Sequence, residues 1–361
     1  MTPVALLFPF GDYWWFYLAF TAGVLVVMAI DLGIFHRDAH EVRFREAATW
    51  SAVWVTLALT FNGALYFYSS WAFARDARLA ALPGFSPEAA AGQVALEFLT
   101  GYLVEYSLSV DNIFVFILVF RYFGVQAQYQ HRVLFYGILG ALVFRALFIA
   151  LGSVLMQFHW VVWVFGAFLI FTGIKMAFSS GDSVDPERNL LVRLFRRVCP
   201  VTPRFHGQRF FVPVDGRWQA TPLFLTLLCL EASDIVFAID SVPAIYALTA
   251  EPLIVFTSNI FAILGLRSMY FMLGGALQRF HLLRFGLAGV LVFVGLKMVA
   301  LDAWYGGKFP IAVSLVIIAV LILASVVASL IVPPRPEASG EPLAEHQGKE
   351  PAVREGDGHS A

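Results

Sequence analysis

Nine stretches of about 20 mostly apolar residues constrain this chain most, because about 20 such residues are needed for a helix to cross a bilayer. Of the 361 residues, 60% are hydrophobic and 14% are charged, whereas a soluble domain has about 25% charged residues. The net charge of -1 argues against a nucleic-acid partner. We therefore expect an all-α polytopic membrane protein whose surroundings are the lipid bilayer. The expected spans are 14–35, 48–70, 94–120, 131–154, 158–178, 221–248, 252–275, 281–301 and 310–332.

Lysine and arginine are distributed unevenly between the two sets of loops. Seventeen of the 24 basic residues fall on one side of the expected spans, three fall on the other, and four lie inside spans. Basic residues concentrate in cytoplasmic loops. The sequence therefore predicts an external N-terminus and a cytoplasmic C-terminus.

Six segments follow from these spans. The basic loop is expected to link the two halves or to bind soluble partners, and the final segment, rich in Pro, Glu, Gly and Ser, should be disordered. The segments are two N-terminal spans (1–93), a first group of three spans (94–178), the basic cytoplasmic loop (179–220), a second group of three spans (221–301), a last span (302–332) and the tail (333–361).

The two groups of three spans resemble each other. FLTGYLVEYS at 98–107 matches FLTLLCLEAS at 224–233 with an offset of 126 residues. After a four-residue difference in loop length the offset becomes 122, which pairs Arg145 with Arg267. Because each group has an odd number of spans, the second must cross the membrane in the opposite sense. The sequence thus predicts a 3+3 inverted repeat (spans 3–5 and 6–8), a design of many secondary transporters.

Spans 3 and 6 carry acidic and hydroxyl or amide side chains inside apolar sequence. Charged groups are costly in hydrocarbon and typically mark an ion pathway. Oxygen ligands without His or Cys suit hard cations such as Mn²⁺, Ca²⁺ or Mg²⁺. The groups are Glu105, Ser107, Ser109, Asp111 and Asn112 in span 3, and Glu231, Ser233, Asp234, Asp240 and Ser241 in span 6.

The angular positions of these carboxylates predict interrupted helices. At 100° per residue, Glu231 and Asp240 lie about 180° apart, so a regular helix would turn one of them towards lipid. Pro243 cannot donate a hydrogen bond to the carbonyl of Ile239. We therefore expect two broken helices, with a break near Pro243, whose carboxylates converge on one site.

An alternative is that the acids only neutralise basic residues in the spans. Seven acids, including Asp31 and Glu97, stand against four bases, and this excess favours a cation site. Arg145 and Arg267 are expected to be structural partners or gates for the acids. Lys175 and Lys297 are expected to extend towards the membrane surface, and Asp31 to cap a helix end or mark an ion entry.

Four motifs resemble the TerC family, the branch of Alx-like bacterial membrane proteins. They are DLGIFHRDAH, EYSLSVDNIFVF, LEASDIVFAIDSVPAI and the paired GIKM and GLKM. The resemblance covers about Trp14 to Val332. It implies a multi-pass protein of the bacterial cytoplasmic (inner) membrane that exports manganese(II), in a family associated with tellurium resistance. It places the family's acidic metal site on Glu105, Asp111, Glu231, Asp234 and Asp240.

The main hypothesis is therefore a secondary transporter, not an enzyme, that has no resident cofactor and carries Mn²⁺. The alternative is a membrane scaffold of a metal- or tellurite-stress resistance complex, with soluble stress proteins bound at the loop 179–220.

Overall fold

The computed structural model describes residues 6–30, 44–178, 193, 199–214, 216–273, 280, 282–305 and 309–332, apart from the side chain of Asp111. Within these ranges nine helices are long and apolar enough to cross a membrane. All nine expected spans are confirmed. They are α1 (Phe10–Ile30), α2 (Phe44–Phe73), α4 (Pro87–Phe123), α5 (Ala127–Leu155), α6 (His159–Phe178), α8 (Pro222–Tyr246), α9 (Pro252–Leu273), α10 (Leu283–Leu296, continuing to Trp304) and α12 (Ile311–Ile331).

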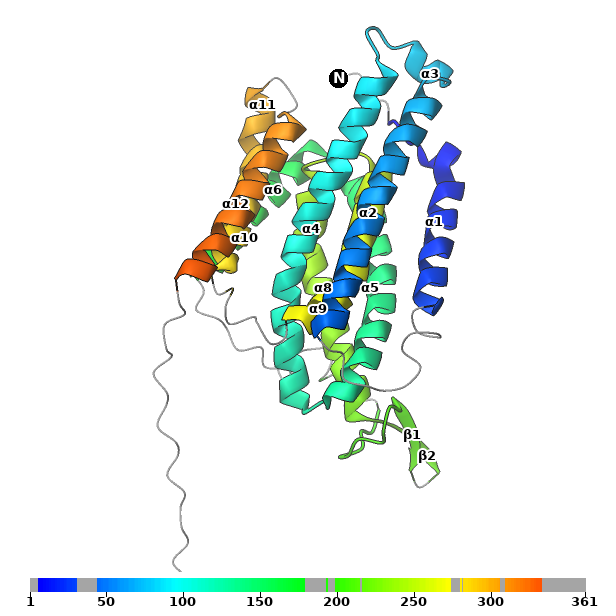
Figure 1. Ribbon diagram of the computed structural model, residues 1–361, viewed down its shortest axis with the longest axis vertical. Helices are drawn as coiled ribbons and strands as arrows, with labels where there is room; N and C mark the ends of the chain where they lie inside the picture. Colours follow the sequence, from blue (N-terminus) through cyan, green and yellow to red (C-terminus); the bar gives the residue numbers. More distant parts are fainter. Residues whose placement is uncertain are drawn as a thin grey trace, which may run out of the picture.

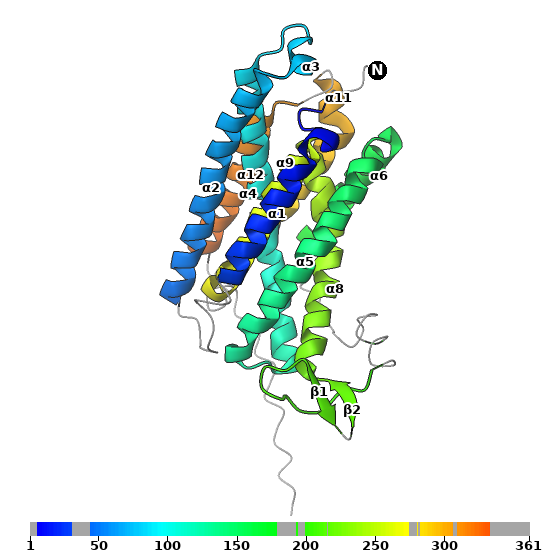
Figure 2. The ribbon, with the colours of Figure 1, turned by 90° about the vertical axis from the view of Figure 1, so that its right-hand side faces the viewer.

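Shorter elements lie at the two ends of the bundle. The helix α3 (Ala77–Ala80) and the helix α11 (Asp302–Trp304) lie at one end, and a hairpin of β1 (Phe211–Val214) and β2 (Arg217–Ala220) lies at the other (Figure 1). The hairpin adjoins the lower ends of α5 and α8, which run side by side (Figure 2). A π-helical turn (Lys297–Leu301) joins α10 to α11.

Helix α9 is the centre of the bundle. Every residue from Leu253 to Tyr270 is buried, because α2, α4 and α5 surround it. A helix with apolar residues on all of its sides is expected in such a place, and the polar residues that α9 also carries, such as Asn259 and Arg267, are buried with them. By contrast α12 exposes large apolar side chains such as Val316, Leu323 and Leu330, which suits contact with lipid.

The expected interruptions of the two acidic helices are wrong. The helix α4 runs without a break for 37 residues, from Pro87 after the Ser86 cap to Phe123, and the φ of 64° at Gly124 ends it. The helix α8 is continuous through Pro243. Pro243 lies in the last turn, so its missing amide removes a single hydrogen bond, and its own carbonyl accepts from the amide of Ala247 at 3.0 Å.

Candidate functional site

Arg145 of α5 is the centre of a buried polar cluster. Its side chain is 1% exposed and forms an ion pair with Glu105 of α4. It also donates to both carboxylate oxygens of Asp234 on α8, at 3.1 and 3.4 Å. The same guanidinium donates to Ser241 Oγ on α8 and to Asn259 Oδ1 on α9, each at 3.2 Å. Four helices thus meet at one side chain.

The acids of this cluster carry more negative charge than Arg145 neutralises. Glu105 is 1% exposed and Asp234 is 4% exposed. Among the described residues, Glu105 Oε2 and Asn259 Nδ2 have no hydrogen-bond partner. Buried polar atoms are normally paired. The carboxylate of Glu105 therefore retains an oxygen that can bind a cation or accept a further hydrogen bond.

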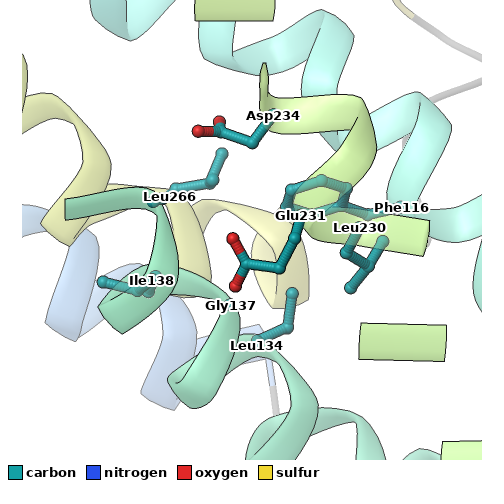
Figure 3. Close-up of a pocket in the computed structure, with 9 residues that line it drawn as sticks. Phe116, Leu134, Gly137, Ile138, Leu230, Glu231, Asp234 and Leu266 are labelled. Carbon is teal, nitrogen blue, oxygen red and sulfur yellow. The ribbon is translucent and has the colours of Figure 1, made fainter. Parts of the chain in front are cut away.

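Glu231 lies next to this cluster, in a small cavity that Asp234 also lines (Figure 3). The cavity has a volume of about 10 Å³, close to the minimum that holds one water molecule. Its other walls are apolar and come from Phe116, Leu134, Ile138, Leu230 and Leu266. Glu231 Oε2 has no partner among the described residues. This second carboxylate therefore also has an oxygen available to a ligand.

Asp240 does not lie with these acids. It is about 120° around the regular helix from Asp234, and it interacts electrostatically with Lys175 of α6. Its neighbours Val236 and Ile239 are 60% and 41% exposed. The structure therefore does not bring all the predicted carboxylates together: the described part of the chain holds no group of three or more His, Cys, Asp or Glu that could hold a metal.

The remaining predicted residues have varied places. Ser107 and Ser233 donate to backbone carbonyls one turn earlier in their own helices, at 2.6 and 2.9 Å. Asn112 and Arg267 are buried, at 3% and 5% exposure. Asp31 and the side chain of Asp111 lie outside the described residues, so the structure does not test their roles.

Asn259 is a functional candidate that the sequence reading missed. It lies in the middle of α9 and contacts Arg145. An amide inside a membrane helix is itself a signal of function or packing.

A second, larger cavity lies on the other side of Arg145 along α5. It has a volume of about 1120 Å³ and is lined by Ala146, Ile149 and Ser153 of α5 and by Asp302 of α11. The small cavity contacts α5 at Leu134, Gly137, Ile138 and Ala141 instead. Arg145 therefore separates, along α5, a large cavity near the α11 end from the small cavity of Glu231.

The family profile described as "Integral membrane protein TerC family" matches residues 90–337, which include every polar residue of this cluster. The chain belongs to the TerC family. The match confirms the family resemblance and includes all the quoted motifs except DLGIFHRDAH, which lies at 31–40.

Several curated bacterial proteins are similar to this TerC-family chain over most of their length. An "Uncharacterized membrane protein STKORF319" of Myxococcus xanthus is 52% identical over 313 residues, 86% of this chain and 91% of the relative. The "Putative membrane-bound redox modulator Alx" of Escherichia coli (strain K12) is 46% identical over 311 residues, 85% of this chain and 92% of the relative. No solved structure matches the chain.

Proposed function

We propose that this protein is a secondary transporter that exports divalent manganese from the cytoplasm of a bacterium, across the cytoplasmic membrane. The observation that carries the proposal is the pair Glu105 and Asp234, which are buried in two spanning helices and face one guanidinium. Buried ionisable groups in membrane helices are costly and typically serve ion or proton pathways. The choice of manganese rests on the family resemblance.

The oxygens at this site define which ions it suits. Carboxylates from α4 and α8, the Ser241 hydroxyl and the Asn259 carbonyl oxygen converge, and Glu231 lies in the adjoining cavity. Such a donor set is typical of hard cations, and Mn²⁺ is the proposed substrate. Of the predicted ligands, Glu105 and Asp234 belong to this proposed site, Glu231 lies in the adjoining cavity, and Asp240 is not part of the site in this structure.

Close helix packing supports the proposed inverted repeat. A methyl group on Gly173 of α6 would lie 2.8 Å from the carbonyl oxygen of Ala288 on α10. A methyl group on Gly295 of α10 would lie 2.6 Å from the carbonyl oxygen of Gly166 on α6. Residues 166 and 288 are 122 positions apart, and so are residues 173 and 295. The repeat therefore maps the contact between 173 and 288 onto the contact between 295 and 166. We propose alternating access about the corresponding pseudo-twofold axis.

The proposal is tested by measuring cell manganese. Bacteria that lack their own manganese exporters and express the protein should hold less manganese under manganese excess than cells with an empty vector. Glu105→Gln should abolish that difference, because the amide removes the charge and leaves Arg145 to neutralise Asp234 alone.

The control is Glu88→Gln, which changes an exposed carboxylate in the first turn of the same helix. This variant should lower cell manganese as the wild type does. If the wild-type protein leaves cell manganese unchanged at normal expression, the export proposal is wrong.

A further inference from the structure

The side chain of Arg145 lies where a cation bound by this site would lie. Its three nitrogens contact oxygens from α4, α8 and α9, while Arg145 itself comes from α5. A planar guanidinium can satisfy several carboxylate and carbonyl oxygens at once. The cluster is thus an oxygen site that is already filled by a positive charge of the protein.

A divalent cation cannot bind Glu105 and Asp234 together while this contact persists. Hard cations such as Ca²⁺ and Mg²⁺ take oxygen ligands at about 2.0–2.6 Å, but the guanidinium stands between these two carboxylates and holds Asp234 at 3.1 Å. The positive charge of Arg145 would also repel the incoming ion. Binding of an ion to both acids therefore requires the Arg145 side chain to leave.

The structure provides a place for that side chain. The large cavity contacts α5 at Ala146, which follows Arg145 in the chain, and at Ile149 and Ser153, and it reaches Gln157 beyond the end of the helix. Its volume of about 1120 Å³ is ample for a guanidinium and water. Rotation about the side-chain bonds of Arg145 would carry its guanidinium away from the acids and towards this cavity.

We propose that Arg145 is a tethered substitute for the transported cation: it occupies the oxygen site when no ion is bound and turns out of it when a divalent cation binds Glu105 and Asp234. This inference rests on the proposed function. It gives Arg145 a role beyond stabilising the fold, because competition with the guanidinium weakens ion binding and lets the ion leave. The empty site also keeps a positive charge beside its two acids while the carrier returns.

Competition predicts that removal of the charge strengthens binding. Purified Arg145→Gln should bind Mn²⁺ about tenfold more tightly than the wild type in calorimetric titration with manganese chloride, because only a minor fraction of wild-type sites is free of the guanidinium. Arg145→Lys keeps a tethered charge and should retain the weaker affinity. Arg132→Gln, on the same helix but bound to Gln208 outside the site, is the matched control and should bind as the wild type does.

A folded Arg145→Gln protein that binds Mn²⁺ no more tightly than the wild type would overturn the inference. If that variant does not fold, the wild-type protein decides the question. Arg145 is 1% exposed, so its modification by phenylglyoxal, followed by peptide mass spectrometry, should increase when Mn²⁺ is added. Unchanged or reduced modification at Arg145 would contradict displacement.

Failure of the proposed function has a different signature. In that case wild-type protein would bind no Mn²⁺, and Asp234→Asn would behave as the wild type in the same titration. A different result would reject only the proposed role of Arg145. In that result Asp234→Asn abolishes Mn²⁺ binding, whereas Arg145→Gln binds Mn²⁺ with the same affinity as the wild type.

Discussion

At the scale of single residues, a glycine of α5 allows Glu231 to reach its cavity. The carboxylate of Glu231 lies against Gly140, where a methyl group would overlap it. At Gly137, about one turn away, a methyl group would meet only Leu227 Cδ1, at 3.9 Å. The position of this acid therefore depends on the missing side chain at residue 140.

Gly140→Ala should displace the Glu231 carboxylate. We expect Mn²⁺ binding about 10- to 100-fold weaker, the loss typical when a group that orients a metal ligand is disturbed. The matched variant Gly92→Ala, on α4 where a methyl group would meet no atom within 4 Å, should keep wild-type affinity in the same titration. Equal affinities of the two alanine variants would show that Glu231 takes no part in the site.

The residues of the site were only partly predictable from the sequence. Glu105, Asp234 and Arg145 stood out because charges are rare in apolar spans, and the structure brings them together. Asn259 was missed because its helix carries no acid and its position has no matching polar residue in the repeat. Asp240 was assigned to the same site because spacing along a chain does not show which neighbouring helix a side chain faces.

At the scale of helices, the two lysines paired by the repeat have different surroundings. Lys175 is exposed on α6, as expected for a side chain that reaches the membrane surface. Lys297 is 5% exposed, and the expectation of the same behaviour is wrong there. It donates to the carbonyl oxygen of Ala247, after α8, at 2.5 Å and pairs with Asp302 at 3.2 Å. The π-helical turn therefore ties α10 to the end of α8.

Lys297→Met should destabilise this junction, because it leaves the Ala247 carbonyl and one Asp302 oxygen without their donor. We expect the free energy of unfolding to fall by about 1–3 kcal/mol, measured by thermal melting of the purified protein. Lys175→Met, which removes an exposed charge, should cost less than about 1 kcal/mol. A loss as large for Lys175→Met as for Lys297→Met would contradict this account of the junction.

The helices were easier to predict than their continuity. Apolar stretches of about 20 residues predicted all nine described spans, because only helices of this length cross a bilayer. The continuity of α4 and α8 was not foreseen, because the angular argument assumed that every carboxylate faces one site. In the structure Asp234 and Ser241 bind Arg145. Asp240 lies about 120° around the same helix and interacts electrostatically with Lys175, so a regular helix accommodates both directions.

At the scale of the whole molecule, the proposed transport pathway lies among α4, α5, α8 and α9. These helices belong to the two groups of three spans that the sequence pairs, by an offset of 126 residues for α4 and α8 and of 122 residues after them. The external N-terminus and cytoplasmic C-terminus remain predictions from the basic loops. Along α5, Arg145 lies between the large cavity near α11 and the small cavity of Glu231. A carrier that is closed towards one side of the membrane is expected to have a barrier to the ion at such a position.

Manganese flux into liposomes that contain the purified protein, with a manganese-sensitive dye inside, tests the transport proposal most directly. We expect wild-type protein to admit Mn²⁺ faster than protein-free liposomes do, and Asp12→Asn, which alters an exposed acid at the start of α1, to match it. Asp234→Asn should reduce the flux to the protein-free rate. Wild-type flux no greater than that of protein-free liposomes, or an Asp234→Asn flux equal to the wild type, would contradict a cation pathway through this site.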